Sequence, residues 1–152
     1  MIFQGKSNVL VKEAVLHCAA IRTGQFNGYR PFQVFTTINR WHKERGFKNG
    51  FGYHGIFMPD GTFYSGRPLH MVGAHVMGRN LGTWGLLLIE SKQIKPRDDG
   101  SPGQFDDYYT EAQGRALRAW LRMWPQLEKV SGHNDYAAKL CPGFKVKSSD
   151  WI

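Results

Sequence analysis

Cysteine is scarce in this chain of 152 residues, with only Cys18 and Cys141 present. Two cysteines are too few for a disulfide scaffold, so they form either one pair or two thiols with separate roles. No apolar run reaches the roughly 18 residues that span a bilayer. The charged residues Lys6, Lys12 and Glu13 interrupt the amino-terminal stretch where a secretory signal would need a continuous apolar segment. We therefore expect a soluble protein made in the cytoplasm without a signal peptide.

Acidic residues are also few, with 12 Asp and Glu against 20 Lys and Arg, so the net charge is +8. Such a charge favours a polyanionic partner such as nucleic acid, an anionic membrane surface or a bacterial wall. No helical segment combines a basic face with base-stacking aromatic residues, and we therefore expect no nucleic acid partner. The hydrophobic content of 41% excludes a disordered chain, and the length fits one domain over residues 1–152.

Two apolar runs have the length of buried strands. Residues 13–20, "EAVLHCAA", form the first, which places His17 near a strand end, with Cys18 on the opposite strand face as a packing residue. Residues 82–91, "GTWGLLLIES", form the second and suit the middle of a sheet. Residues 51–66 predict a hairpin around a Pro-Asp-Gly turn, with its first strand beginning at Tyr53 and His54.

Two helices are predicted between and after these strands. One begins at Pro31 and ends at Gly46, and a capping box of Thr110 and Gln113 starts the other, which ends before Pro125. The apolar face of the second helix is formed by Leu117, Trp120, Leu121 and Trp124. Residues 92–109 are rich in Pro, Gly and Asp and predict a long surface loop. The order of elements indicates an α/β single domain, a central mixed β-sheet flanked by helices.

His17, His133 and Cys141 offer the ligand types that zinc prefers, and three protein ligands leave a fourth position open, as catalytic zinc sites require. Each residue also has an ordinary interpretation. A single histidine is more often a surface or core residue than a ligand, and Cys141 alone can be a small buried hydrophobic residue. A disulfide between Cys18 and Cys141 is a further alternative, which metal binding would exclude.

Five sequence blocks occur in the order that a known family has: "VLHCAA", "INRWHKERGF" followed by "GYH", "DGTFYSGRP", "GAHVMGRN" and "GHNDYAAKLCPGF". Over about residues 13–144 the chain thereby resembles the zinc-dependent N-acetylmuramoyl-L-alanine amidases of type 2, and among them the small amidase-type lysozymes of bacteriophages. These enzymes share a fold with peptidoglycan recognition proteins. The resemblance implies that fold and a single catalytic amidase domain over residues 1–152, without a separate wall-binding domain.

Carried over residue by residue, the resemblance makes His17, His133 and Cys141 the ligands of one catalytic zinc ion. It makes Tyr53 and Lys139 the catalytic residues that stabilise the oxyanion formed at the lactyl carbonyl of N-acetylmuramic acid. Lys139 lies two residues before Cys141, so in an extended segment both side chains face the same side. The proton for the leaving amine comes from Tyr53 or from the zinc-bound water, and the sequence leaves both open.

The strand at residues 82–91 departs from some cytoplasmic relatives. Those relatives carry a catalytic glutamate where this chain has Leu87. Glu90 lies three residues further on and, at a strand period of two, faces the opposite side. The departure favours the phage type of enzyme, which uses the tyrosine.

Further residues near the matched blocks are candidates for substrate binding. His75 is expected to line the groove or to be a hydrogen-bonded structural residue. Arg79 either pairs with a stem-peptide carboxylate or is a solvated surface charge. Arg67 is a third candidate. His42 stands beside charged neighbours on a predicted helix, and we expect it at the surface.

The resemblance implies a phage endolysin that hydrolyses the amide bond between N-acetylmuramic acid and L-alanine of bacterial peptidoglycan for host lysis. The alternative is a non-catalytic recognition module that binds peptidoglycan. We expect a monomer that is made in the host cytoplasm and acts in the periplasm or cell wall. Binding to an RNA polymerase is a property of some phage relatives and enters here by family analogy alone.

Overall fold

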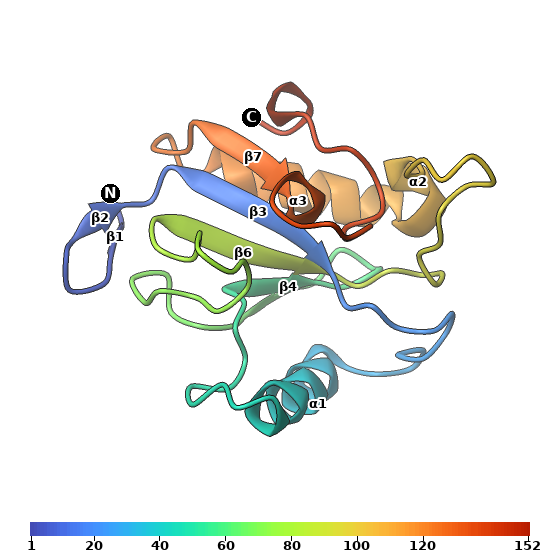
Figure 1. Ribbon diagram of the computed structural model, residues 1–152, viewed down its shortest axis with the longest axis horizontal. Helices are drawn as coiled ribbons and strands as arrows, with labels where there is room; N and C mark the ends of the chain where they lie inside the picture. The colour runs from blue at the N-terminus through green and yellow to red at the C-terminus, as the bar shows by residue number, and fades with distance from the viewer.

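Five strands form the central sheet of the computed structural model, which describes residues 1–152. Their order is β5-β4-β6-β3-β7 (Figure 1). The strands are β3 (Glu13–Cys18), β4 (Gly55–Phe57), β5 (Phe63–Ser65), β6 (Thr83–Leu88) and β7 (Lys129–Gly132). All neighbouring pairs are parallel except β4 with β5. The predicted mixed sheet is confirmed, and β6 has the central position that its unbroken apolar sequence indicated.

Two helices cover opposite faces of this sheet. The helix α3 (Glu111–Arg122) packs on the larger apolar cluster, which contains Trp84 and Leu86 of β6, and lies behind the sheet in Figure 1. The helix α1 (Pro31–Glu44) packs on a smaller cluster that contains Leu87. Because side chains alternate along a strand, neighbouring residues of β6 enter different clusters.

The helix ends follow their local sequence signals. The Thr110 hydroxyl accepts a hydrogen bond from the Gln113 amide at 3.1 Å, and the Gln113 side chain accepts one from the Thr110 amide at 2.9 Å. This is the predicted capping box. The first helix begins at Pro31, and Gly46 follows its end with a φ of 91°, a conformation that glycine adopts without strain.

Two local predictions need correction, and three strands were not expected. The expected loop at 92–109 contains a short helix, α2 (Phe105–Tyr108), whose four residues are too few for a periodic signal. The strand β4 begins at Gly55, because the chain bends at His54 and turns Tyr53 toward the α1 side. The unexpected strands are β1 (Phe3–Gln4) and β2 (Val9–Leu10), which form a separate antiparallel sheet, and β7 of the central sheet.

Candidate metal centre

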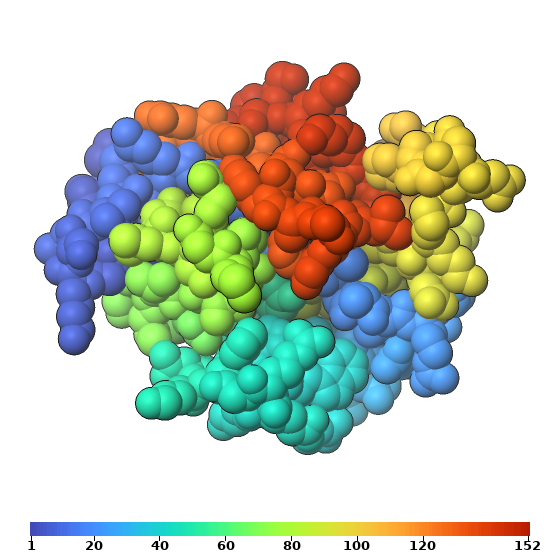
Figure 2. All heavy atoms as spheres, viewed as in Figure 1, coloured from blue at the N-terminus to red at the C-terminus, as the bar shows by residue number.

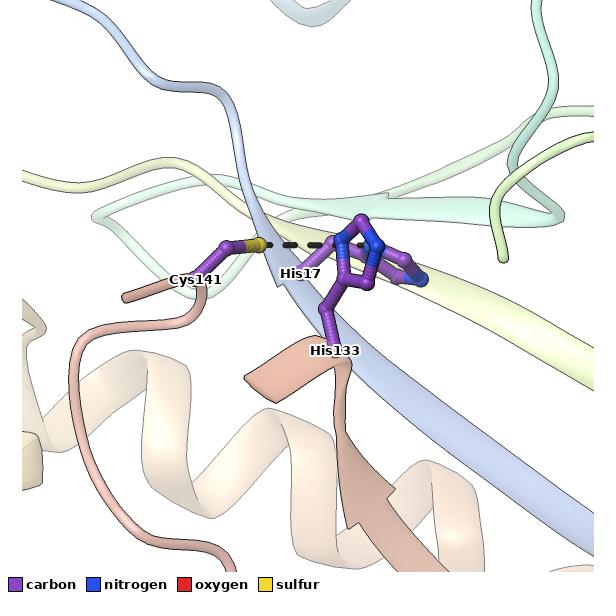
Figure 3. Close-up of side chains that lie close together, drawn as sticks. All are labelled: His17, His133 and Cys141. Carbon is purple, nitrogen blue, oxygen red and sulfur yellow. Dashed lines mark hydrogen bonds between the residues drawn. The ribbon is translucent and has the colours of Figure 1, made fainter. Parts of the chain in front are cut away.

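His17, His133 and Cys141 come together at one edge of the sheet (Figure 3). β3 and β7 are parallel neighbours with Leu16 opposite Gly132, so the next residues, His17 and His133, lie side by side. Their rings are 4.8 Å apart between centroids. Cys141 approaches from the loop that follows, and one ligand atom from each residue lies within 4.8 Å of the others.

The donor set fits a zinc ion. The distance between Cys141 Sγ and His17 Nδ1 is 4.0 Å, less than the roughly 4.4 Å that a Zn–S and a Zn–N bond span end to end. Two imidazoles and one thiolate are typical zinc ligands, and three of them leave a position for substrate or water. Cys18 and Cys141 are both free thiols in the structure. The residues can therefore hold one metal ion.

The electrostatics of the two thiols favours a thiolate at Cys141. A hydrogen bond from Cys18 holds the pKa of Cys141 well below its usual value, and a hydrogen bond with His133 acts in the same direction. The same hydrogen bond and burial raise the pKa of Cys18, whose backbone amide also donates to Cys141 Sγ at 3.1 Å. Burial lowers the pKa of His17, which keeps the ring neutral. Thiolate and neutral imidazole are the forms that bind metals.

The loop that carries Cys141 is held by hydrogen bonds to its own backbone and to a neighbouring helix. The Asn134 amide donates to the Cys141 carbonyl at 2.8 Å, and the Asn134 side chain donates to the Phe144 carbonyl at 3.1 Å. The Tyr109 hydroxyl donates to the Pro142 carbonyl at 2.7 Å. These contacts fix an irregular segment whose ligand would otherwise be free to move away from the sheet.

A groove of about 710 Å³ opens above the three ligands, and His133 and Cys141 belong to its lining. Figure 2 shows the hollow between the α1 segment, the segment around residues 70–80 and the loop after β7. Tyr53 and Lys139 line it as well. The Tyr53 ring lies 5.0 Å from the His17 ring, and burial raises the pKa of its hydroxyl, which therefore stays protonated at neutral pH. Lys139 is exposed to solvent at the groove.

The three candidates for substrate binding are placed differently. His75 lines the groove, but its ring nitrogens contact His17 and Thr83. Arg67 does not line the groove, because its guanidinium is buried and donates to the backbone carbonyls of residues 50, 51 and 72. Arg79 does not line it either and pairs with Glu13 at 3.1 Å.

Two groove residues differ from the sequence-based expectation. His42, expected at the surface, is only 5% exposed and lines the groove beside Tyr53, at 5.5 Å between ring centroids. Its Nδ1 accepts a hydrogen bond from the Gly52 amide. The signal was its spacing of four residues from Ile38, which places both on the buried face of α1. Cys18, expected to pack on the opposite strand face, also lines the groove, because β3 ends there and the chain turns.

Leu87 belongs to β6, and Glu90 follows the end of that strand. Leu87 is fully buried in the α1-side cluster. The Glu90 carboxylate accepts hydrogen bonds from the amides of Ala19 and Ala20, each at 2.9 Å. Glu90 therefore holds the backbone just after β3.

Similar proteins occur both among known sequences and among solved structures. No family model matches the chain. It is 34% identical over 135 residues to an endolysin of Klebsiella phage KP32, a match that covers 87% of this chain and 80% of that protein. Its structure is similar to that of the N-acetylmuramoyl-L-alanine amidase LysC from Clostridium intestinale, with a TM-score of 0.68 at 25% identity over 93% of this chain and 83% of that one.

The fold is also that of Drosophila PGRP-LB, with a TM-score of 0.70 at 20% identity over 95% of this chain and 79% of that one. The likeness at this identity concerns the fold alone. It confirms the expected architecture, in which a mixed sheet is flanked by helices.

Proposed function

The chain belongs to the family of phage endolysins that are N-acetylmuramoyl-L-alanine amidases, and we propose that it acts through one zinc ion held by His17, His133 and Cys141. Its reaction is hydrolysis of the amide bond between N-acetylmuramic acid and L-alanine in bacterial peptidoglycan. The observation that carries the zinc proposal is the convergence of two imidazoles and one thiol beside an open groove. Tyr53 and Lys139, which line the same groove, are the proposed catalytic residues.

The metal ion, Lys139 and Tyr53 have different roles in the proposed reaction. When bound, zinc would lower the pKa of its water toward about 7 and would act as a Lewis acid that polarises the scissile carbonyl. The Lys139 ammonium and the Tyr53 hydroxyl donate hydrogen bonds to the oxyanion that develops on the substrate carbonyl. Each such donor contributes about 3 kcal/mol to transition-state stabilisation. The Tyr53 hydroxyl, kept protonated by burial, can also give the leaving amine its proton.

The zinc proposal is tested by replacing the sulfur ligand, Cys141, and a control replaces the neighbouring Cys18. We expect Cys141→Ala to lose bound zinc and, with it, release of soluble stem peptides from purified peptidoglycan, by on the order of 10³-fold or more. The matched control is Cys18→Ser, which replaces a thiol of the same groove that is not a proposed ligand and keeps a hydrogen-bond donor toward Cys141. It should keep its zinc and most of its activity. Undiminished cleavage by the Cys141→Ala protein would refute the zinc mechanism.

A non-catalytic recognition module is the competing function. Such a module needs a groove that binds peptidoglycan but has no need of three ligand atoms within 4.8 Å of one another. The same variant separates the two functions. A module would release no stem peptide in wild-type form, and Cys141→Ala would leave its pelleting with insoluble peptidoglycan unchanged.

The site of action follows from the substrate. We propose that the enzyme is made in the host cytoplasm and works in the periplasm or cell wall. None of the helices combines the length and the apolar character needed to cross a bilayer. The single catalytic domain over residues 1–152, the monomeric state and binding to an RNA polymerase stay predictions.

A further inference from the structure

A chain of hydrogen bonds runs from His17 into the protein, away from the other two ligands. His17 Nε2 lies 2.9 Å from His75 Nδ1, and His75 Nε2 lies 3.2 Å from Thr83 Oγ1. The Thr83 hydroxyl ends the chain at the carbonyl oxygens of Arg79, at 2.8 Å, and Asn80, at 3.1 Å. The three side chains are buried, with exposed fractions of 1% for His17, 8% for His75 and 4% for Thr83.

The carbonyl groups at the far end set the direction of every bond in this chain. A carbonyl oxygen only accepts, so the single hydroxyl proton of Thr83 is directed to it. Thr83 then offers His75 a lone pair, and His75 Nε2 carries the proton that fills this contact. A neutral imidazole has one N–H, so His75 Nδ1 accepts and His17 Nε2 donates. His17 Nδ1 is left without a proton, and this is the atom that lies toward Cys141.

We propose that His75 and Thr83 are positioning residues that hold His17 in the tautomer protonated at Nε2 and so present its Nδ1 lone pair to a metal ion. The metal part of this inference rests on the proposed function, whereas the tautomer does not. Partners of this kind orient metal-binding histidines in other proteins and increase their affinity for the ion.

The opposite direction is incompatible with metal binding. It would require Thr83 to donate to His75 across 3.2 Å instead of to the Arg79 carbonyl at 2.8 Å. His75 Nδ1 would then donate to His17 Nε2, and the His17 proton would move to Nδ1. That proton would take up the Nδ1 lone pair that a metal ion would need.

The fold gives the His75 ring a dedicated place. The backbone amides of His75 and Val76 both donate to the Asn80 side-chain oxygen, at 2.8 and 2.9 Å. A Cβ atom on Gly85 of β6 would lie 2.5 Å from the His75 ring. Glycine at this position of the central strand is therefore what allows the ring to lie against the sheet, nearly perpendicular to the His17 ring at 86°.

The direct test is imidazole ¹⁵N NMR of the metal-free wild-type protein, which distinguishes protonated from unprotonated ring nitrogens. We expect a protonated Nε2 and an unprotonated Nδ1 on His17, and the same tautomer on His75. A proton on His17 Nδ1 would overturn the proposal. Because no metal and no substrate are present, this result is independent of whether the proposed amidase mechanism holds.

Variants of Thr83 test the consequence for the metal. Thr83→Val removes the hydroxyl and should weaken zinc binding by about 10- to 100-fold in competition with a chromophoric chelator, with His17 spread over both tautomers in the ¹⁵N spectrum. Thr83→Ser retains the hydroxyl and should restore both the affinity and the single tautomer. Wild-type zinc affinity together with an unchanged tautomer in a folded Thr83→Val protein would also overturn the proposal.

Discussion

The two faces of the central sheet use the same strands for different purposes. On the α3 side, the residues that face the helix are fully buried and apolar: Ala14, Leu16, Trp84, Leu86 and Leu88. On the other side, the alternate positions of the same two strands mix apolar with polar residues and glycine: Glu13, Val15, His17, Thr83, Gly85 and Leu87. A strand presents successive side chains to opposite faces, so one segment can build the core and the site together.

The difference between the faces lies in how burial is compensated. Apolar side chains on the α3 side gain free energy simply by leaving water. Polar side chains on the site side need partners, because an unpaired buried polar group costs free energy. Glu13 Oε2 accepts hydrogen bonds from Ser131 and Tyr136, each at 2.5 Å, and His17 is bonded to His75. The α3 side should therefore dominate stability, whereas substitutions on the site side should act mainly on chemistry.

The largest expected effect is on the α3 side. Trp84→Ala removes a fully buried indole that packs against Trp120 and Trp124, and should lower the free energy of unfolding by about 3–5 kcal/mol. Urea denaturation measures it. Met77→Ala, at a side chain that is 98% exposed, should change stability by less than about 0.5 kcal/mol. A loss below about 1 kcal/mol for Trp84→Ala would show that this face does not dominate the fold.

The next effect is confined to catalysis. Lys139→Met removes the proposed oxyanion donor at the groove and should lower kcat/KM by about 10²- to 10³-fold. Because Lys139 is exposed, stability should stay within about 0.5 kcal/mol of wild type. Lys147→Met removes an exposed charge outside the groove lining and serves as the control. Equal losses of activity in both variants would point to general charge attraction by the basic protein rather than to a catalytic ammonium.

Acid should lower the stability of the folded protein through a buried histidine, His54. Burial lowers the pKa of His54 from 6.5 to about 4, so the folded protein keeps this ring neutral while the unfolded chain binds a proton below pH 6.5. Its contribution to stability is thus complete above pH 6.5, the pKa in the unfolded chain. It is lost as the pH falls toward about 4, the pKa in the folded protein. Between about pH 7 and pH 5 the loss is about 2 kcal/mol. Because His42 and His75 also have lowered pKa values, the size is checked by urea denaturation of wild type and His54→Gln across this range. An NMR titration of His54 that found an unshifted pKa would contradict it.

The smallest effect concerns the charged group on the site side. Burial would raise the pKa of Glu13, but hydrogen bonds from Ser131, Tyr136 and Arg79 outweigh it, and the pKa lies below its usual value. Glu13→Gln should therefore cost about 1 kcal/mol of stability. Glu128→Gln is the matched control, since Glu128 pairs with Lys12 in an exposed ion pair that contributes little. Equal free energies of unfolding for the two variants would remove the distinction between a buried and an exposed carboxylate.

Elements with strong local signals could be predicted from the sequence. The capping box of Thr110 and Gln113 starts α3 as expected, because both hydrogen bonds lie within one turn. The short helix α2 was missed, since its stability depends on contacts such as the stacking of Phe105 on Tyr109 rather than on periodicity. His42 was predicted at the surface because its sequence neighbours are charged. Those neighbours do not indicate the face of the helix on which His42 lies, and this face is buried.

The sequence by itself determined the two apolar strands β3 and β6, the helices α1 and α3, the family, and the identity of His17, His133 and Cys141 as a possible ligand set. Only the tertiary structure decided how these residues meet, because the pairing of β3 with β7 joins segments more than 100 residues apart. It also decided that Arg67 binds backbone carbonyls and that His75 lies behind His17. Hydrogen-bond direction depends on the full set of partners in space, and no spacing along the chain records it.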